Sequence, residues 1–169
     1  EKETVRQNGP IPVVRTASWG QVASTSMTPS LIPWLWRLQR KQDVIHVHLP
    51  NPMANLALLL TRPKARIAVH WHSDIVKQKN LLRLYAPLQD WLLKRADVIF
   101  ATSPPYAESS PWLEPHMKKV RFVPSCIRDP EATSDAATRQ RLAQQVRARY
   151  PGRKIIFALG RMTYYKGFD

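Results

Sequence analysis

Four histidines recur in two short patterns, each with one residue between the imidazoles. His46 and His48 lie in the run DVIHVHL, and His70 and His72 lie in RIAVHWH. If both runs are β-strands, alternate residues share a face, so each pair lies on one face of its strand. Neighbouring strands would then bring the four rings together, an arrangement that can hold a metal ion.

A metal site is one interpretation of these histidines, and hydrogen-bonded packing is the other. Apart from Asp43 at the start of the first run, the surrounding sequence supplies only Asp74 to complete a typical catalytic shell, so we expect no bound metal. We expect His46 and His70 to be structural because they lie inside their strands. His48 and His72 lie at the strand ends, where a ligand crevice would form.

The stretch HWHSDIV places an imidazole, a hydroxyl and a carboxylate where a strand ends. His72, Ser73 and Asp74 are suited to hydrogen-bonding a sugar or a phosphate, or to orienting a reacting hydroxyl group. The alternative is that Ser73 or Asp74 caps the following helix, and the two roles are compatible. We take His72 as the candidate catalytic residue.

Two further polar residues stand between a predicted strand and a predicted helix. Asn51 precedes Pro52, and Ser103 precedes Pro104, which is the usual pattern of an N-cap followed by proline in the first turn. Helix N-termini also attract anions, although we expect capping to be the main role of Ser103. Both residues, with His48, Ser73 and Asp74, are candidates for the lining of the ligand cleft.

The segment GRMTYYKG near residue 160 combines a glycine with two cations. Gly160 permits a tight exit from a strand, Arg161 offers a planar fork for phosphate oxygens, and Lys166 adds a second, mobile charge. Two separated cations fit a diphosphate. Without further context, the simpler alternative is a pair of ordinary surface residues.

Short apolar runs, most of them continuously apolar, alternate with helical patterns along the chain. The runs cover residues 12–14, 43–49, 66–72, 97–103, 120–125 and 154–160. Continuous apolar strands separated by helices predict an α/β fold with a Rossmann-like, mostly parallel, doubly wound sheet covered by flanking helices on both faces. Ligands of such sheets bind beyond the carboxyl ends of the strands.

The sequence predicts three regions. Residues 1–128 form a Rossmann-like domain, residues 129–152 a polar linker with a surface helix, and residues 153–169 the first strand of a second domain. One strand cannot bury a core by itself. A single cysteine, Cys126, fits a reducing compartment, and we expect a cytoplasmic protein, with peripheral contact to the membrane face.

A net charge of +14 would draw the chain towards phosphates, nucleic acid or an anionic membrane. The aromatic residues do not form the interleaved pattern of a nucleic-acid surface, so a basic nucleic-acid-binding module is a rival interpretation and not the preferred one. No apolar run approaches the ~18 residues that span a bilayer.

In their order, these motifs resemble the retaining glycosyltransferases of family 4, which have the GT-B architecture of two facing Rossmann-like domains. The resemblance covers roughly residues 40–169 and rests on DVIHVHLPNP, VHWHSDIV, the segment from 81 to 113, VRFVPSCI and ALGRMTYYKGFD. It implies that Arg161 and Lys166, with Gly160, bind the donor diphosphate and that His72 faces the donor sugar. It also implies a nucleotide-sugar donor and no cofactor or essential metal.

The resemblance further implies transfer of a hexose, such as mannose, to a saccharide or lipid-linked acceptor in the synthesis of cell-surface polysaccharide or glycolipid. Residues 1–15 do not match the family's first strand and glycine-rich loop, and little of the donor domain is present by residue 169. We therefore expect the chain to be inactive alone. A GT-B epimerase or phosphorylase is the second rival.

Overall fold

The computed structural model describes residues 4–8, 11–22, 25–75, 79–126, 129, 134–160 and 167 of the 169-residue chain. The chain divides into two compact units, Glu1–Ser125 and Cys126–Asp169, and each is described here by itself. Arg161 and Lys166 lie outside the described residues.

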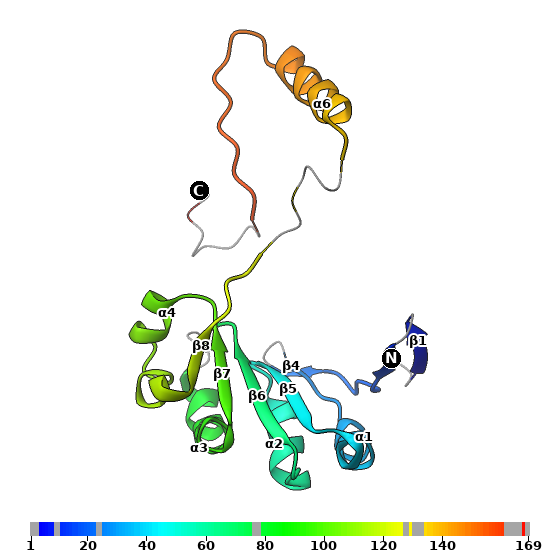
Figure 1. Cartoon of the computed structure of the whole chain (residues 1–169), viewed down its shortest axis with the longest axis vertical. Helices are drawn as coiled ribbons and strands as arrows, with labels where there is room; N and C mark the ends of the chain where they lie inside the picture. Colours follow the sequence, from blue (N-terminus) through cyan, green and yellow to red (C-terminus); the bar gives the residue numbers. More distant parts are fainter. Residues whose placement is uncertain are drawn as a thin grey trace. The chain divides into compact units, whose positions relative to one another are not determined.

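A four-stranded parallel sheet forms the centre of the first unit (Figure 1). Its strands, in spatial and chain order, are β5 (Val44–Leu49), β6 (Arg66–Trp71), β7 (Val98–Ala101) and β8 (Val120–Phe122). These are the runs that the sequence identified as strands of a parallel sheet, although β8 is shorter than the run 120–125. The Rossmann-like α/β prediction is confirmed for this unit.

Helical segments connect the strands. They are α2 (Pro52–Thr61), α3 (Lys79–Arg95), and α4 (Pro104–Ser109) with the 3-10 helix η2 (Glu114–Lys119); α1 (Leu31–Leu38) and the 3-10 helix η1 (Gln39–Lys41) precede the sheet. The start of α2 follows from its sequence, because Asn51 accepts a hydrogen bond from the Ala54 backbone N–H at 3.1 Å and Pro52 occupies the first turn.

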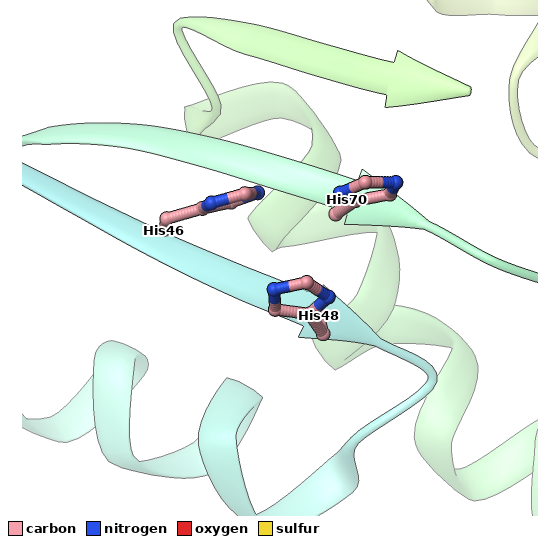
Figure 2. Close-up of side chains that lie close together, drawn as sticks. All are labelled: His46, His48 and His70. Carbon is pink, nitrogen blue, oxygen red and sulfur yellow. The ribbon is translucent and has the colours of Figure 1, made fainter. Parts of the chain in front are cut away.

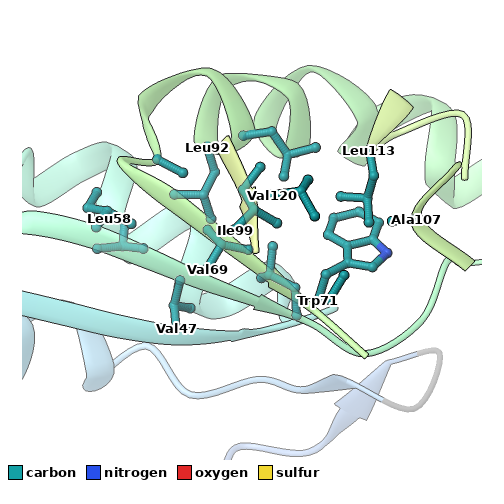
Figure 3. Close-up of a cluster of buried hydrophobic side chains, with 14 residues drawn as sticks. Val47, Leu58, Val69, Trp71, Leu92, Ile99, Ala107, Leu113 and Val120 are labelled. Carbon is teal, nitrogen blue, oxygen red and sulfur yellow. The ribbon is translucent and has the colours of Figure 1, made fainter. Parts of the chain in front are cut away.

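The core lies between the sheet and these helices (Figure 3). Alternate strand residues point into it: Val47, Leu49, Ile67, Val69, Trp71, Ile99, Ala101 and Val120. Leu58 of α2, Leu92 and Leu93 of α3, and Ala107 and Leu113 meet them from the helical layer. A single layer of helices therefore buries one face of the sheet.

The opposite face differs from the prediction of strands covered on both sides. His46 and His48 on that face are exposed, and His70 is half-buried. The reason is topological: the four strands follow one another in chain order across the sheet, so right-handed crossovers place every connecting helix on the same side. A doubly wound sheet needs a reversal of strand order, and the described strands contain none.

Two small antiparallel hairpins lie before the sheet in the chain. In one, β1 (Thr4–Asn8) pairs with β2 (Ile11–Arg15), and in the other, β3 (Gln21–Val22) pairs with β4 (Thr25–Ser26). The run 12–14 therefore belongs to a hairpin, and its assignment to the parallel sheet was wrong. A partner strand close in sequence decides this pairing, because a short connection permits only the antiparallel arrangement.

The second unit contains α6 (Ala136–Arg149), whose N-cap Asp135 accepts a hydrogen bond from the Thr138 backbone N–H at 2.7 Å. No residue of α6 is buried, as expected of a surface helix. The described residues 153–159 form no strand, contrary to the prediction for 154–160. Because a strand needs a neighbour for its backbone hydrogen bonds, this apolar segment stays exposed, with Ile156 at 95% and Phe157 at 82%.

Asp97 joins the beginnings of β6 and β7. Its carboxylate accepts hydrogen bonds from the Ile67 backbone N–H at 2.8 Å and from Arg95 Nη1 at 3.2 Å, while its own N–H donates to the Ile67 carbonyl at 2.9 Å. The Ile67 N–H is the main cause that lowers the pKa of Asp97, and the charge of Arg95 adds to it. The ionised carboxylate is therefore favoured in the folded state.

Asp97→Ala should lower the free energy of unfolding at pH 7 by about 1–3 kcal/mol, because it leaves the buried Ile67 N–H without its acceptor. Urea denaturation of both proteins measures this. A lowered pKa stabilises the folded state above the unfolded-state pKa and ceases to do so as pH falls through the folded-state pKa. The difference between the two proteins should therefore shrink below about pH 4.

Asp90→Ala is the matched control, because Asp90 contacts Lys94 at 2.6 Å on the exposed side of α3. It should change stability by less than about 0.5 kcal/mol. Equal losses from the two substitutions would contradict a structural role for Asp97.

Candidate active site

The carboxyl ends of β5 and β6 bring the predicted site histidines together. Parallel register places His48 opposite His70, and the His72 N–H donates to the Leu49 carbonyl at 3.1 Å, which extends the pairing one residue beyond β6. Because side chains alternate along a strand, His46, His48, His70 and His72 share one face. The convergence inferred from the two His-x-His patterns is thus present.

Figure 2 shows His46, His48 and His70 on the same side of the two strands. The rings of His70 and His72 stack with centroids 4.5 Å apart, and those of His48 and His70 stack at 5.0 Å. His48 Nδ1 and His72 Nε2 lie 2.8 Å apart, which is a hydrogen bond. The two histidines expected at the strand ends therefore form a directly bonded pair.

Burial is the main cause that lowers the pKa of His46 and of His70, and the other imidazoles of the cluster lower both values further. A lowered pKa favours neutral rings, and neutral imidazoles can stack without charge repulsion. His46 is exposed, yet its ring packs against His48, His70 and Phe100, and its structural role stays a prediction. The helical layer covers the other face of its strand.

Asp74 has a structural partner set that the sequence did not reveal. Its Oδ1 accepts hydrogen bonds from Trp71 Nε1 at 2.9 Å, the Tyr106 hydroxyl at 3.1 Å and the Ser110 hydroxyl at 2.9 Å. Burial is the main cause that raises the pKa of Tyr106, with the Asp74 charge adding to it, so the hydroxyl remains a donor. Asp74 anchors the loop that carries His72 to α4.

The capping predictions have mixed outcomes. Asn51 caps α2, as predicted, whereas Ser103 stands at the N-cap position of α4 without a side-chain capping hydrogen bond. Asp74 bonds to Trp71, Tyr106 and Ser110 instead of capping the next helix. Ser73 is exposed beside His72, so it stays available to a ligand in the crevice.

The predicted diphosphate site belongs to the second unit of the chain. Gly160 is exposed in the second unit, and Arg161 and Lys166 lie outside the described residues. Their role in donor binding stays a prediction.

A polar cavity of about 400 Å³ lies beside the carboxyl end of β5. Its lining consists of hydroxyl, proline and amide side chains, with one leucine: Thr16, Thr25, Ser26, Thr28, Leu31, Pro50, Asn51 and Pro52. Asn51 and the hydroxyl residues come from separate segments of the chain, so the sequence alone carried no signal of the cavity.

Asp74→Ala should lower the free energy of unfolding by about 2–4 kcal/mol, because the Tyr106 and Ser110 hydroxyls lose their acceptor and Trp71 Nε1 keeps only its 3.2 Å bond to the Tyr106 hydroxyl. Chemical denaturation followed by tryptophan fluorescence measures the loss. Ser73→Ala is the control, since that side chain is exposed and its removal should change stability by less than about 0.5 kcal/mol. Equal effects would contradict the anchoring role of Asp74.

Comparison with known proteins identifies the family of this chain. The family model described as "Glycosyl transferase 4-like domain" matches residues 2–126, which is most of the chain. O-antigen chain mannosyltransferase C of Escherichia coli is 34% identical over 147 residues, covering 87% of this chain. D-rhamnosyltransferase WbpZ of Pseudomonas aeruginosa is 35% identical over 147 residues, again covering 87% of the chain.

The matched region corresponds to 38% of the length of each of these two relatives. The family model covers the parallel sheet, the four histidines and the Asp74 network, which all lie within residues 2–126. The chain therefore belongs to the glycosyl transferase 4-like family.

Proposed function

We propose that this chain is the acceptor-side part of a retaining hexosyltransferase, which transfers a hexose from a nucleotide-sugar donor to a saccharide or lipid-linked acceptor. The observation that carries the proposal is the His48–His72 pair at the carboxyl ends of two parallel strands, in a chain of this family. The names of the two relatives, a mannosyltransferase and a rhamnosyltransferase, support a hexose such as mannose and a role in cell-surface polysaccharide synthesis.

In this proposal His72 contacts the donor sugar. Its Nε2 is bonded to His48 Nδ1, which leaves Nδ1 of His72 as the ring nitrogen for a sugar hydroxyl. The hydrogen bond to His48 and the stacking on His70 hold the ring in one orientation. A fixed orientation favours catalysis, because the ligand then does not have to order the side chain when it binds.

The leaving nucleotide diphosphate would be held by Arg161 and Lys166 once a complete donor domain positions them. Two cations can stabilise the negative charge that develops on the diphosphate, which is the task that a divalent ion performs in other enzymes. We therefore propose transfer without an essential metal or cofactor.

The polar cavity beside β5 is the proposed acceptor subsite. Its hydroxyl groups and the Asn51 side chain suit a sugar, which presents both donors and acceptors of hydrogen bonds. It adjoins Pro50, two residues after His48, so a bound acceptor would lie near the carboxyl end of β5.

Activity should be tested in a protein that joins this segment to a complete donor domain, with a panel of nucleoside-diphosphate hexoses. We expect transfer with retention, observed by NMR of the anomeric proton, and a fall in kcat/KM of about 10²–10⁴-fold for His72→Ala. His116→Ala, in η2, is the matched control and should change the rate little. The 169-residue chain alone should not turn over.

An inverted product, or an active 169-residue chain, would contradict the proposal. Equal losses from His72→Ala and His116→Ala would contradict the proposed role of His72 but not the proposed transfer reaction.

We further propose that the enzyme contacts an anionic membrane face through a basic groove. The groove has a volume of about 400 Å³ and is lined by Trp36, Gln39, Arg40, Gln42, Arg62, Lys64 and Ala65. Trp36 is 51% exposed, and the Arg40 guanidinium lies 4.4 Å from its ring centroid. Tryptophan and cations together suit the interface of an anionic bilayer.

The contact would be peripheral. Within the part of the chain that the structure describes, every helix is too short or too polar to cross a bilayer. Arg62 and Lys64 lie between α2 and β6, at the amino end of the sheet, whereas His72 lies at the carboxyl end. Docking through the basic groove would therefore leave the candidate active site open.

Glutamine in place of Arg40, Arg62 and Lys64, the three cations of the basic groove, should reduce binding to vesicles that contain phosphatidylglycerol. The reduction should be at least about tenfold at low salt, since each basic residue contributes about 1 kcal/mol. Co-sedimentation measures the bound fraction. The matched control replaces three exposed arginines of α6, Arg141, Arg147 and Arg149. Equal binding to neutral and anionic vesicles, or an equal loss in the control, would contradict the proposal.

A further inference from the structure

We propose that His46, His48 and His70 form a binding site for a divalent transition-metal ion on the open face of the sheet. One ligand nitrogen from each of these imidazoles lies within 4.8 Å of the other two. The side chains come from two adjacent strands and lie on the same side of the sheet (Figure 2). The proposed transfer reaction needs no metal, and the site is linked to it through the hydrogen bond between His48 and His72.

The pairing of β5 with β6 already holds the backbone of the three histidines close together. His48 and His70 are opposite each other in the β5–β6 register, and His46 is two residues along the same strand. Imidazole nitrogens bound to one tetrahedral ion are about 3.3 Å apart, because each metal–nitrogen bond is about 2.0 Å long. Rotation about the side-chain bonds, which turns the rings out of their stacks, closes the remaining gap of up to about 1.5 Å, so the strands need not move.

One ring nitrogen of these three histidines lacks a hydrogen-bond partner among the described residues. His70 Nδ1 is buried and has no hydrogen-bond partner among the described residues. A buried polar atom of this kind normally finds a partner, since leaving it unpaired costs about 1–3 kcal/mol. A metal ion bound to His70 would provide that partner.

The hydrogen bond between His48 and His72 suits the same site. If His48 donates its Nδ1–H to His72 Nε2, its own Nε2 is free to bind the ion, and the 2.8 Å bond is retained. Histidines that bind metals usually donate their second nitrogen in this way, which fixes the ring and its tautomer. His72 would then be an outer partner that orients the ligand His48.

The ligand set selects the class of ion. Three neutral imidazole nitrogens suit Zn²⁺, Ni²⁺, Cu²⁺ and Co²⁺, whereas Mg²⁺ and Ca²⁺ prefer oxygen. Two carboxylates lie near these histidines in the chain: Asp43 directly precedes β5, at its amino end, and Asp74 is already bonded to Trp71, Tyr106 and Ser110. We therefore expect Zn²⁺ to bind and Mg²⁺ not to bind.

The test uses the 169-residue chain without an affinity tag, in a Cys126→Ser background that removes the exposed thiol as a competing ligand. Titration with Zn²⁺ by calorimetry should give one ion per chain. His46→Gln, at an exposed position, should weaken binding at least about tenfold, and His46→Gln with His70→Gln should abolish it. The visible spectrum of bound Co²⁺ gives a second readout of the imidazole ligands.

His116→Gln is the matched control, because His116 is the remaining histidine of the five in the chain and lies in η2. It should change the affinity less than about twofold. Circular dichroism without metal checks that His46→Gln keeps the fold. The proposal is overturned if Zn²⁺ does not bind at 100-fold excess, if Mg²⁺ competes equally, or if the control loses as much affinity as His46→Gln.

Discussion

The parallel pairing of β5 with β6 is the constraint on which the rest of the first unit depends. Its register sets Leu49 opposite Trp71 on the buried face and His48 opposite His70 on the open face. A slip of one residue in either strand would exchange the faces. Imidazoles would then enter the core without partners, and large apolar side chains worth about 1.5–3 kcal/mol each would lose their burial.

The same pairing links stability to the site. Trp71 belongs to the core, yet its indole N–H is bonded to Asp74, so the last residue of β6 also holds the loop that follows. Between those two residues lies His72, bonded to His48 across the strand ends. The short loop that carries His72 is therefore fixed at both ends. Trp71 fixes one end by packing in the core, and Asp74 fixes the other end by hydrogen bonds.

The two ends of the sheet carry different chemistry. Imidazoles and hydroxyl groups gather at the carboxyl end, and the cations of the basic groove gather at the amino end. Strands of six residues separate the two by about 20 Å, which is beyond the Debye length in physiological salt. In the proposed enzyme, the charge that attracts an anionic surface would thus disturb the histidines little.

The sequence by itself determined the apolar runs, the parallel strands that most of them form, the cap at Asn51 and the two His-x-His faces, because each depends on local spacing along one strand or helix. Only the tertiary structure decided the partners of Asp74, since Tyr106 and Ser110 lie more than thirty residues away in the chain. It also decided that one face of the sheet stays open and that the run 154–160 forms no strand. Both outcomes depend on which other segments pack on a sheet face or pair with a strand, and the residues of one strand do not specify those segments.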